Sequence, residues 1–255
     1  MRFSKWHALG NSYLLVERED IGNPLAPALA RRLCDPRYGI GSDGLLEVLE
    51  VTGTDASLVI WNPDGSIAEF SGNGTRVGAM WLSERTGANE VAIVVGERRH
   101  DARRDGSLIE MAVGTVEVGE LETIELPEER VELTRVSVGN PHAVIQREPL
   151  RADLLRLGPL LETHERFPER TNVQLVRVDA RDVVTALVWE RGAGETAASG
   201  SSAVAVAGVA VANGWCDSPA TIRMPGGDLR VAIDREMRAT LTGPAQLICT
   251  GEIVL

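Results

Sequence analysis

Two similar segments, placed half a chain apart, constrain the fold of this 255-residue sequence more than any other feature. The segment Ser-Gly-Asn-Gly at 71–74 opens an apolar run with helical spacing, and Ser-Gly-Ser-Ser at 199–202 opens another. Each follows a turn that contains glycine and acidic residues, at 64–69 and at 190–195. Since the chain is long enough for two medium domains, the repeat predicts two similar halves, each with one helix start.

These helix starts are candidate anion sites. Small residues there leave backbone N–H groups exposed, and these groups together with the helix dipole bind a carboxylate or a phosphate. The same field lowers the pKa of a side chain at the N-cap. Two such starts indicate one site in the cleft between the halves. Serine is also a preferred N-cap residue, so Ser71 and Ser199 equally fit an ordinary capping role.

Composition narrows the class of protein. The net charge is −11, from 26 basic and 37 acidic residues, which argues against a nucleic-acid or membrane partner. Lys5 is the only lysine, so an enzyme that uses pyridoxal phosphate (PLP) is disfavoured. The three cysteines have neither zinc-site nor disulfide spacing, and the N-terminus lacks a signal-peptide pattern. We expect a cytoplasmic enzyme that acts on a small molecule and has no metal site.

Short β-branched or alternating segments predict a strand-rich protein. Three segments have helical spacing, at 27–33, 74–85 and 201–213, and 152–161 is a candidate for a fourth helix. No low-complexity linker divides the chain, so the domain boundary is expected at a compact crossover near 113–120. The predicted strands span residues 12–17, 45–51, 56–61, 90–95, 107–113, 135–138, 143–146, 173–178, 183–189, 220–224, 229–233 and 239–242.

Two further motifs carry weaker signals. Residues 39–44 fit the dinucleotide pattern G-x-G-x-x-G, but they precede a predicted strand instead of opening a helix, so a Gly-rich turn is favoured. A serine-hydrolase arrangement would pair Ser71 with His142. However, neither Ser71 nor Ser199 lies in G-x-S-x-G, and no orienting acid follows in a recognisable order.

Seven motifs, in order along nearly the whole chain, resemble the diaminopimelate epimerase family. They are MRFSKWHALGN at 1–11, YGIGSDGL at 38–45, WNPDGS at 61–66, SGNGTR at 71–76, GNPH at 139–142, RTNV at 170–173 and WERGAGET at 189–196. The resemblance implies an α/β (α+β) protein with two pseudo-symmetric domains, each a curled, mostly antiparallel sheet around a central helix. It assigns 1–115, completed by 246–255, to one domain and 116–245 to the other, with the active site in the cleft between them, and it implies a homodimer.

The reaction implied by the resemblance is the interconversion of L,L- and meso-diaminopimelate without PLP or any other cofactor, in lysine and peptidoglycan biosynthesis. One group removes the α-proton while another delivers a proton to the opposite face. In the family both groups are cysteines, and here Ser71 and Ser199 occupy their positions. His142 matches the residue that assists at Ser71, and Glu190 matches the one that assists at Ser199.

The resemblance also identifies substrate-binding residues. Asparagine and arginine side chains suit the distal ammonium and carboxylate of diaminopimelate, since arginine pairs with carboxylates and amide oxygens accept from ammonium groups. The first turn of each helix matches the α-carboxylate site. The implied residues are Asn62, Asn140, Asn172 and Arg191 for the distal groups, Asn11 in the pocket lining, and Gly72, Asn73, Gly200 and Ser201 at the helix starts.

The two serines are the main departure from the family pattern. A thiol has a pKa of about 8.5, and a helix N-terminus brings it within reach of the thiolate, whereas each pKa unit above that costs about 1.4 kcal/mol. A serine hydroxyl lies several units higher. Three hypotheses fit this departure: a natural serine lineage that uses His142 and Glu190 for proton transfer, a Cys-to-Ser variant that binds without turnover, and a homologue that binds diaminopimelate or another amino acid or epimerises a related one.

Overall fold

A computed structural model describes residues 1–21 and 23–254, so Leu255 of the expected segment 246–255 lies outside the described residues. The chain divides into two compact units. The N-unit comprises residues 1–111 and 243–255, and the C-unit comprises residues 112–242. The chain leaves the N-unit within strand β8 (Leu108–Thr115) and returns within strand β17 (Arg238–Pro244).

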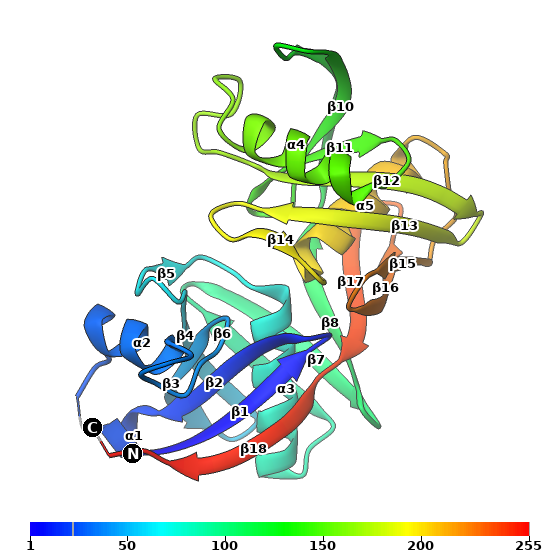
Figure 1. Ribbon diagram of the computed structural model, residues 1–255. Coiled ribbons are helices and arrows are strands. Elements are labelled where there is room, and N and C mark those ends of the chain that lie inside the picture. The colour runs from blue at the N-terminus through cyan, green and yellow to red at the C-terminus, as the bar shows by residue number, and fades with distance from the viewer. Residues whose placement is uncertain (22, 255) are drawn as a thin grey trace. The chain divides into compact units, whose positions relative to one another are not determined.

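The N-unit sheet has the strand order β18-β1-β2-β3-β4-β6-β7-β8, with β5 paired to β4 (Figure 1). Its β2–β3 and β4–β6 pairs are parallel, and the other pairs are antiparallel. The remaining elements of this unit are β1 (Arg2–Ala8), β2 (Asn11–Glu17), α1 (Arg18–Ile21), α2 (Pro27–Cys34), β3 (Leu45–Thr52), β4 (Asp55–Trp61), β5 (Ile67–Ala68), α3 (Gly72–Thr86), β6 (Glu90–Val95), β7 (Arg98–Asp105) and β18 (Gln246–Glu252).

The C-unit repeats this pattern of strand directions. Its order is β9-β10-β11-β12-β13-β15-β16-β17, with parallel β11–β12 and β13–β15 pairs and β14 paired to β13. Its other elements are β9 (Glu117–Glu125), β10 (Arg130–Ser137), β11 (Pro141–Gln146), α4 (Arg151–Glu162), β12 (Asn172–Ala180), β13 (Val183–Glu190), β14 (Gly194–Thr196), α5 (Gly200–Ala212), β15 (Ala220–Met224) and β16 (Gly227–Ile233).

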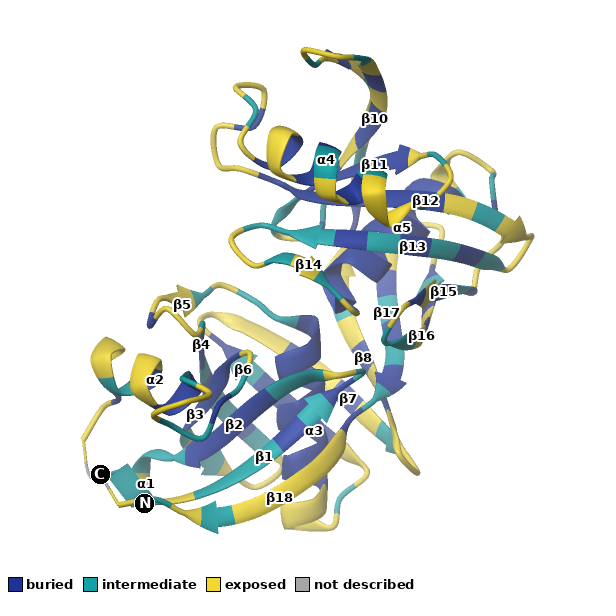
Figure 2. Ribbon diagram, in the orientation of Figure 1, coloured by how far each residue is buried: buried dark blue, intermediate teal, exposed yellow. Residues whose placement is uncertain are grey.

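Each sheet curls around one central helix. Helix α3 contacts β1, β2, β4, β6 and β7, and helix α5 contacts strands from β9 to β16. Both helices are buried over most of their length, as the dark blue colouring in Figure 2 shows. Burial on all sides explains the run of small apolar residues in α5, whereas α3 also buries the polar side chains of Asn73, Thr75 and Arg76. The expected fold, two similar halves with a curled and mostly antiparallel sheet around a helix, is confirmed.

A second helix covers the outer face of each sheet. Leu33 of α2 packs with Leu14 and Leu45, whereas Leu157 of α4 packs with Leu175 in the C-unit. No helix in the described part of the chain combines the length and the hydropathy that a membrane span requires.

All four predicted helices and all twelve predicted strands occur, with ends shifted by a few residues. The predictions missed α1 and the strands β5, β7, β9 and β14, and they did not bound β1 or β18. Strand β7 alternates buried His100 and Ala102 with exposed polar residues, so few apolar side chains mark it. Most residues of β9 and β18 are exposed, so their sequences lack the alternation of apolar and polar side chains that marks a half-buried strand.

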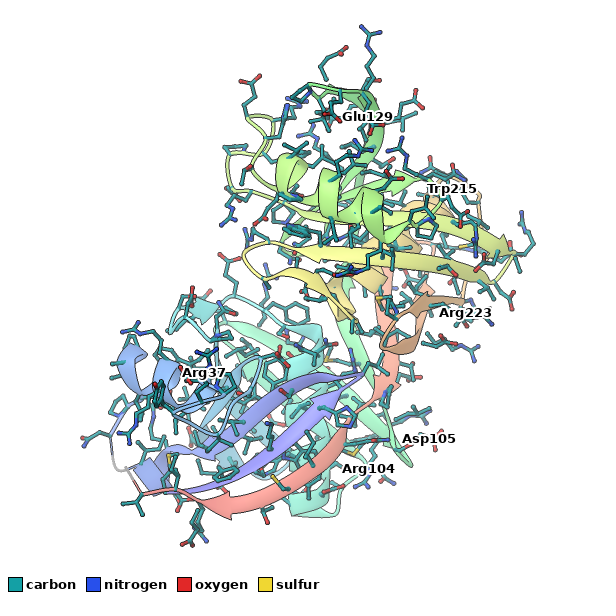
Figure 3. The ribbon with its side chains drawn as sticks, in the orientation of Figure 1. Arg37, Arg104, Asp105, Glu129, Trp215 and Arg223 are labelled. Carbon is teal, nitrogen blue, oxygen red and sulfur yellow. The ribbon has the colours of Figure 1, made fainter. Side chains whose placement is uncertain are left out.

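Arginine–carboxylate pairs cover much of the surface. Glu129, labelled in Figure 3, contacts Arg147 at 2.6 Å and Arg156 at 2.5 Å. The hydrogen bond from Arg147 is the main cause that lowers the pKa of Glu129. Such exposed pairs add little stability individually, so the buried sheets and helices carry the fold.

Candidate active site

Ser71 and Ser199 are the N-caps of the two central helices. Their backbone conformations are nearly identical, with φ and ψ of −141° and 115° for Ser71 and −140° and 125° for Ser199. Ser71 Oγ accepts from the N–H of Gly74 at 3.1 Å, and Ser199 Oγ accepts from that of Ser202 at 3.5 Å. The capping role is therefore confirmed, and the same geometry places each hydroxyl beside the first-turn N–H groups of a helix.

In the N-unit, Ser71 has a second hydroxyl as its neighbour. Tyr13, on β2, lies with its Oη 2.8 Å from Ser71 Oγ. Close by, Asn73 Nδ2 donates to Asn11 Oδ1 at 3.2 Å, while Arg76 Nη2 donates to Asn73 Oδ1 at 2.8 Å. The structure thus joins Asn11, Ser71 and Asn73, three residues predicted to belong to the site, and adds Tyr13 and Arg76.

Arg76 is a fully buried cation one turn into α3. Its Nη1 donates to the carbonyl oxygen of Gly72 at 3.2 Å, so the guanidinium lies along the first turn of the helix. Burial lowers the pKa of Arg76 to about 10, and a negative charge on Tyr13 would raise it. At neutral pH the side chain is still charged, so it places a positive charge behind the helix start that Ser71 caps.

In the C-unit, Ser199 has a carboxylate as its neighbour. Its hydroxyl donates to Glu190 Oε2 at 3.1 Å, and Ser201 Oγ lies 3.5 Å from Ser199 Oγ. Glu190 ends β13, and the β13–β14 hairpin leads directly to the start of α5. The predicted pairing of Glu190 with Ser199 is thus present as a direct hydrogen bond, whereas Ser71 is paired with the hydroxyl of Tyr13.

His142 is buried in a hydrogen-bonded network on β11. Its Nδ1 lies 3.0 Å from Gln174 Nε2, which also donates to Ser202 Oγ, and its Nε2 lies 3.0 Å from Asn140 Oδ1. Because Gln174 Nε2 can only donate, Nδ1 accepts and Nε2 carries the hydrogen. Burial is the main cause that lowers the pKa of His142 to about 3, with Arg191 adding to it. His142 is therefore neutral and positions Asn140, and its predicted role at Ser71 stays a prediction.

Arg191 and Asn172, which are predicted to bind the distal carboxylate and the distal ammonium, are joined by a hydrogen bond. The backbone N–H of Arg191 donates to Asn172 Oδ1 at 3.0 Å, and Asn172 Nδ2 donates to the carbonyl oxygen of Pro141 at 2.8 Å. The Arg191 guanidinium donates through Nη1 to the carbonyl oxygen of Glu169 at 3.1 Å. These contacts hold two side chains that are distant in sequence in one corner of the C-unit.

Glu162 supports this corner, although sequence reasoning missed it. This nearly buried carboxylate at the end of α4 accepts from the N–H of Gly192 at 2.7 Å, from Trp189 Nε1 at 2.7 Å, and from Arg170 Nη2. Gly192 adjoins Arg191 in the turn, so the carboxylate fixes the backbone that carries the arginine. The only available signal was an acidic residue within an apolar helical run.

A pocket of about 470 Å³ lies beside this network in the C-unit. Asn140 and His142 line it, together with Arg135, Arg166 and Arg170. Asn140 therefore faces an open volume while its Oδ1 contacts His142. Within residues 1–21 and 23–254, no group of three histidine, cysteine or acidic side chains is arranged to hold a metal ion.

The other predicted residues lie at element ends. Gly72 and Asn73 begin α3, and Gly200 and Ser201 begin α5, as expected for the α-carboxylate site. Asn62 lies in the β4–β5 turn, where its Nδ2 donates to Ser66 Oγ at 2.9 Å, so its local contacts are with the turn and not with Ser71.

Sequences similar to this chain extend over both units. The family profile described as diaminopimelate epimerase matches residues 3–118 and 134–248. "Diaminopimelate epimerase 2" of Nostoc sp. is 36% identical over 99% of this chain and 95% of its own length. The diaminopimelate epimerase of Pelotomaculum thermopropionicum is also 36% identical, over 99% of this chain and 98% of its own length.

Solved structures share the fold at low sequence identity. A predicted epimerase from Pseudomonas aeruginosa has a TM-score of 0.75 at 18% identity and covers 100% of this chain and 99% of its own. A hydroxyproline epimerase from Agrobacterium vitis has a TM-score of 0.76 at 14% identity and covers 99% and 90%. From the matched sequence over both units, the chain belongs to the diaminopimelate epimerase family of isomerases.

Proposed function

We propose that this chain binds diaminopimelate and interconverts its L,L and meso forms, using one proton-transfer group from each unit and no cofactor. The observation that carries the proposal is the corner formed by Arg191 and Asn172, which lies next in sequence to the Glu190–Ser199 pair. Arg191 and Asn172 suit the carboxylate and the ammonium at the distal end of the substrate, and the neighbouring Ser199 hydroxyl has Glu190 as its proton acceptor. Arg191 binds the distal carboxylate, and Asn62, Asn140 and Asn172 bind the distal ammonium.

The first turns of α3 and α5 bind the α-carboxylate. Their N–H groups point out of the helix ends, and the helix dipoles favour a negative charge there. Holding the α-carboxylate in this way also stabilises the negative charge that develops when the α-proton leaves. Ser71 and Ser199 cap these turns, so each hydroxyl lies beside the N–H groups that would hold the α-carboxylate in its own unit.

Binding is tested by calorimetry with L,L- and meso-diaminopimelate. We expect both isomers to bind, and we expect Arg191→Leu to weaken their binding at least tenfold. The affinity for L-lysine, which lacks the distal carboxylate, should not change in this variant. Arg230→Leu, which changes an exposed arginine of β16, is the matched control. Absence of binding at millimolar ligand to the folded protein would show that the substrate assignment is wrong.

Turnover is tested by exchange of the α-hydrogen in deuterated water. We expect slow exchange by the unsubstituted chain, because a serine hydroxyl ionises less readily than a thiol, and much faster exchange after Ser71→Cys and Ser199→Cys together. Exchange that remained absent in the cysteine variant, with binding intact, would instead support a protein that only binds its ligand.

The setting of this activity follows from the same proposal. A PLP-independent epimerase of lysine and peptidoglycan biosynthesis works in the cytoplasm, where its substrate is made.

We further propose a homodimer. Its support is β18, at the end of the N-unit ladder, where Leu247 and Ile248 are 46% and 51% exposed. Light scattering coupled to gel filtration should give twice the monomer mass, and Ile248→Lys should return the monomer.

A further inference from the structure

The hydroxyl of Tyr13 has no role in the function proposed so far, although it touches the proton-transfer position of the N-unit. It lies 2.8 Å from Ser71 Oγ, which also accepts from the N–H of Gly74. The tyrosine is 6% exposed and stands on β2, a strand that packs against α3. Ser71 therefore shares a hydrogen bond with the buried, ionisable side chain of Tyr13, and Ser199 shares one with the carboxylate of Glu190.

A phenol suits proton transfer better than an alcohol. The ordinary pKa of a tyrosine is about 10, several units below that of a serine hydroxyl. The charge of buried Arg76 favours the ionised phenol, since the interaction by which a charged Tyr13 raises the pKa of Arg76 works in both directions. Among the described residues, the Arg76 guanidinium donates to the Gly72 carbonyl oxygen and to Asn73 Oδ1, neither of which is a carboxylate.

We propose that Tyr13 is the acid–base group of the N-unit and that it exchanges its proton with the substrate through Ser71. The proposal rests on the function inferred above. Ser71 touches the substrate, and Tyr13 acts through it, so the serine never has to hold a full negative charge. A residue 58 positions away in sequence thereby replaces the acidity that a thiol would supply at position 71.

The proton balance gives each unit a starting role. Ser199 Oγ takes the α-proton as the Cα–H bond breaks, and its own hydroxyl proton passes to the carboxylate of Glu190. The electron pair left on the α-carbon takes the Ser71 hydroxyl proton, and the Tyr13 proton moves to Ser71 Oγ, leaving a phenolate opposite Arg76. Water then returns a proton to Tyr13 and removes one from Glu190. The C-unit starts as the base and the N-unit as the acid.

The test is a double-mutant cycle on α-hydrogen exchange of diaminopimelate in deuterated water. Tyr13→Phe removes only the hydroxyl, and it should lower the exchange rate at saturating ligand by at least 100-fold, within the range for loss of a general acid–base group. The dissociation constant measured by calorimetry should change less than threefold. The control is Tyr38→Phe, which changes the other tyrosine of the chain, 83% exposed, and should leave both quantities unchanged.

Cysteine at position 71 distinguishes a relay from a packing role. A thiol at the helix N-terminus ionises without a proton from Tyr13, so Ser71→Cys should exchange faster than the unsubstituted chain, and adding Tyr13→Phe to it should cost less than about threefold. An equal loss in both backgrounds, or unchanged exchange in Tyr13→Phe, overturns the relay. Exchange by the cysteine variant with none by the unsubstituted chain also overturns it but leaves the substrate assignment standing. Failure of the unsubstituted chain to bind diaminopimelate overturns the proposed function and the relay with it.

Discussion

The buried His142 makes the stability of this protein depend on mild acid. Its ring is 1% exposed, and burial lowers its pKa to about 3, whereas an unfolded histidine has a pKa of about 6.5. Between pH 6.5 and pH 3, His142 therefore binds a proton in the unfolded chain but stays neutral in the folded chain. The contribution of a neutral His142 is complete above pH 6.5 and is lost as the pH falls from there toward 3.

The size of the effect follows from the two pKa values. Each pH unit within this window removes about 1.4 kcal/mol from the free energy of unfolding. Relative to pH 7.5, the loss due to His142 is about 1.4 kcal/mol at pH 5.5 and about 2.7 kcal/mol at pH 4.5. Carboxylates titrate in the lower part of this range as well. The contribution of His142 to the unfolding free energy therefore has to be isolated by comparison with a variant that lacks the histidine.

The perturbation is His142→Gln, which keeps a polar side chain and removes the titrating ring. Urea unfolding of both proteins at pH 7.5, 5.5 and 4.5 gives the difference in unfolding free energy, in which the common carboxylate terms cancel. This difference should shrink by the stated amounts as the pH falls. His164→Gln, outside the buried network, controls for the number of histidines. A difference that stays constant with pH would refute the claim that His142 is held neutral.

Two further predictions concern the packing that supports the site. Glu162→Gln should lower the unfolding free energy by about 1–3 kcal/mol and weaken diaminopimelate binding, because the amide can no longer accept from Gly192, Trp189 and Arg170 together. Urea unfolding measures the first effect and calorimetry the second. The control is Glu165→Gln, which changes an exposed carboxylate. If Glu165→Gln had the same effect, the role of Glu162 would be disproved. Gly208→Ala should cost about 1–3 kcal/mol in urea unfolding, since its Cβ would come 2.5 Å from Val116 Cγ1; an unchanged midpoint would mean that Val116, in the connection between β8 and β9, moves away from α5 without cost.

Local sequence patterns predicted the central helices and their caps because they depend on nearby residues. The Ser-Gly starts at 71 and 199 satisfy N–H groups within their own first turn, and the apolar runs that follow need burial on every face. The strands with strong apolar alternation were predicted for the same reason. Strands such as β9 and β18, which are mostly exposed, give no such pattern.

The candidate site was predicted only in part. The resemblance named Glu190 as the partner of Ser199, and the structure contains that hydrogen bond. It did not name Tyr13, Gln174 or Glu162, which contact the predicted residues. Tyrosine, glutamine and glutamate are common residues in cores and on surfaces, so the sequence alone does not mark these three as part of a site. Their role follows from the residues that they contact in the structure.

The sequence by itself determined the duplicated architecture, the two helix starts and the family, since these depend on spacing, capping and motifs in order along the chain. The tertiary structure decided what surrounds each serine. Ser71 lies against a phenol from β2 with a buried arginine close by, whereas Ser199 lies against a carboxylate from β13. These contacts depend on sheet register and on how each sheet curls around its helix, so equivalent positions in a repeat can acquire opposite electrostatic surroundings.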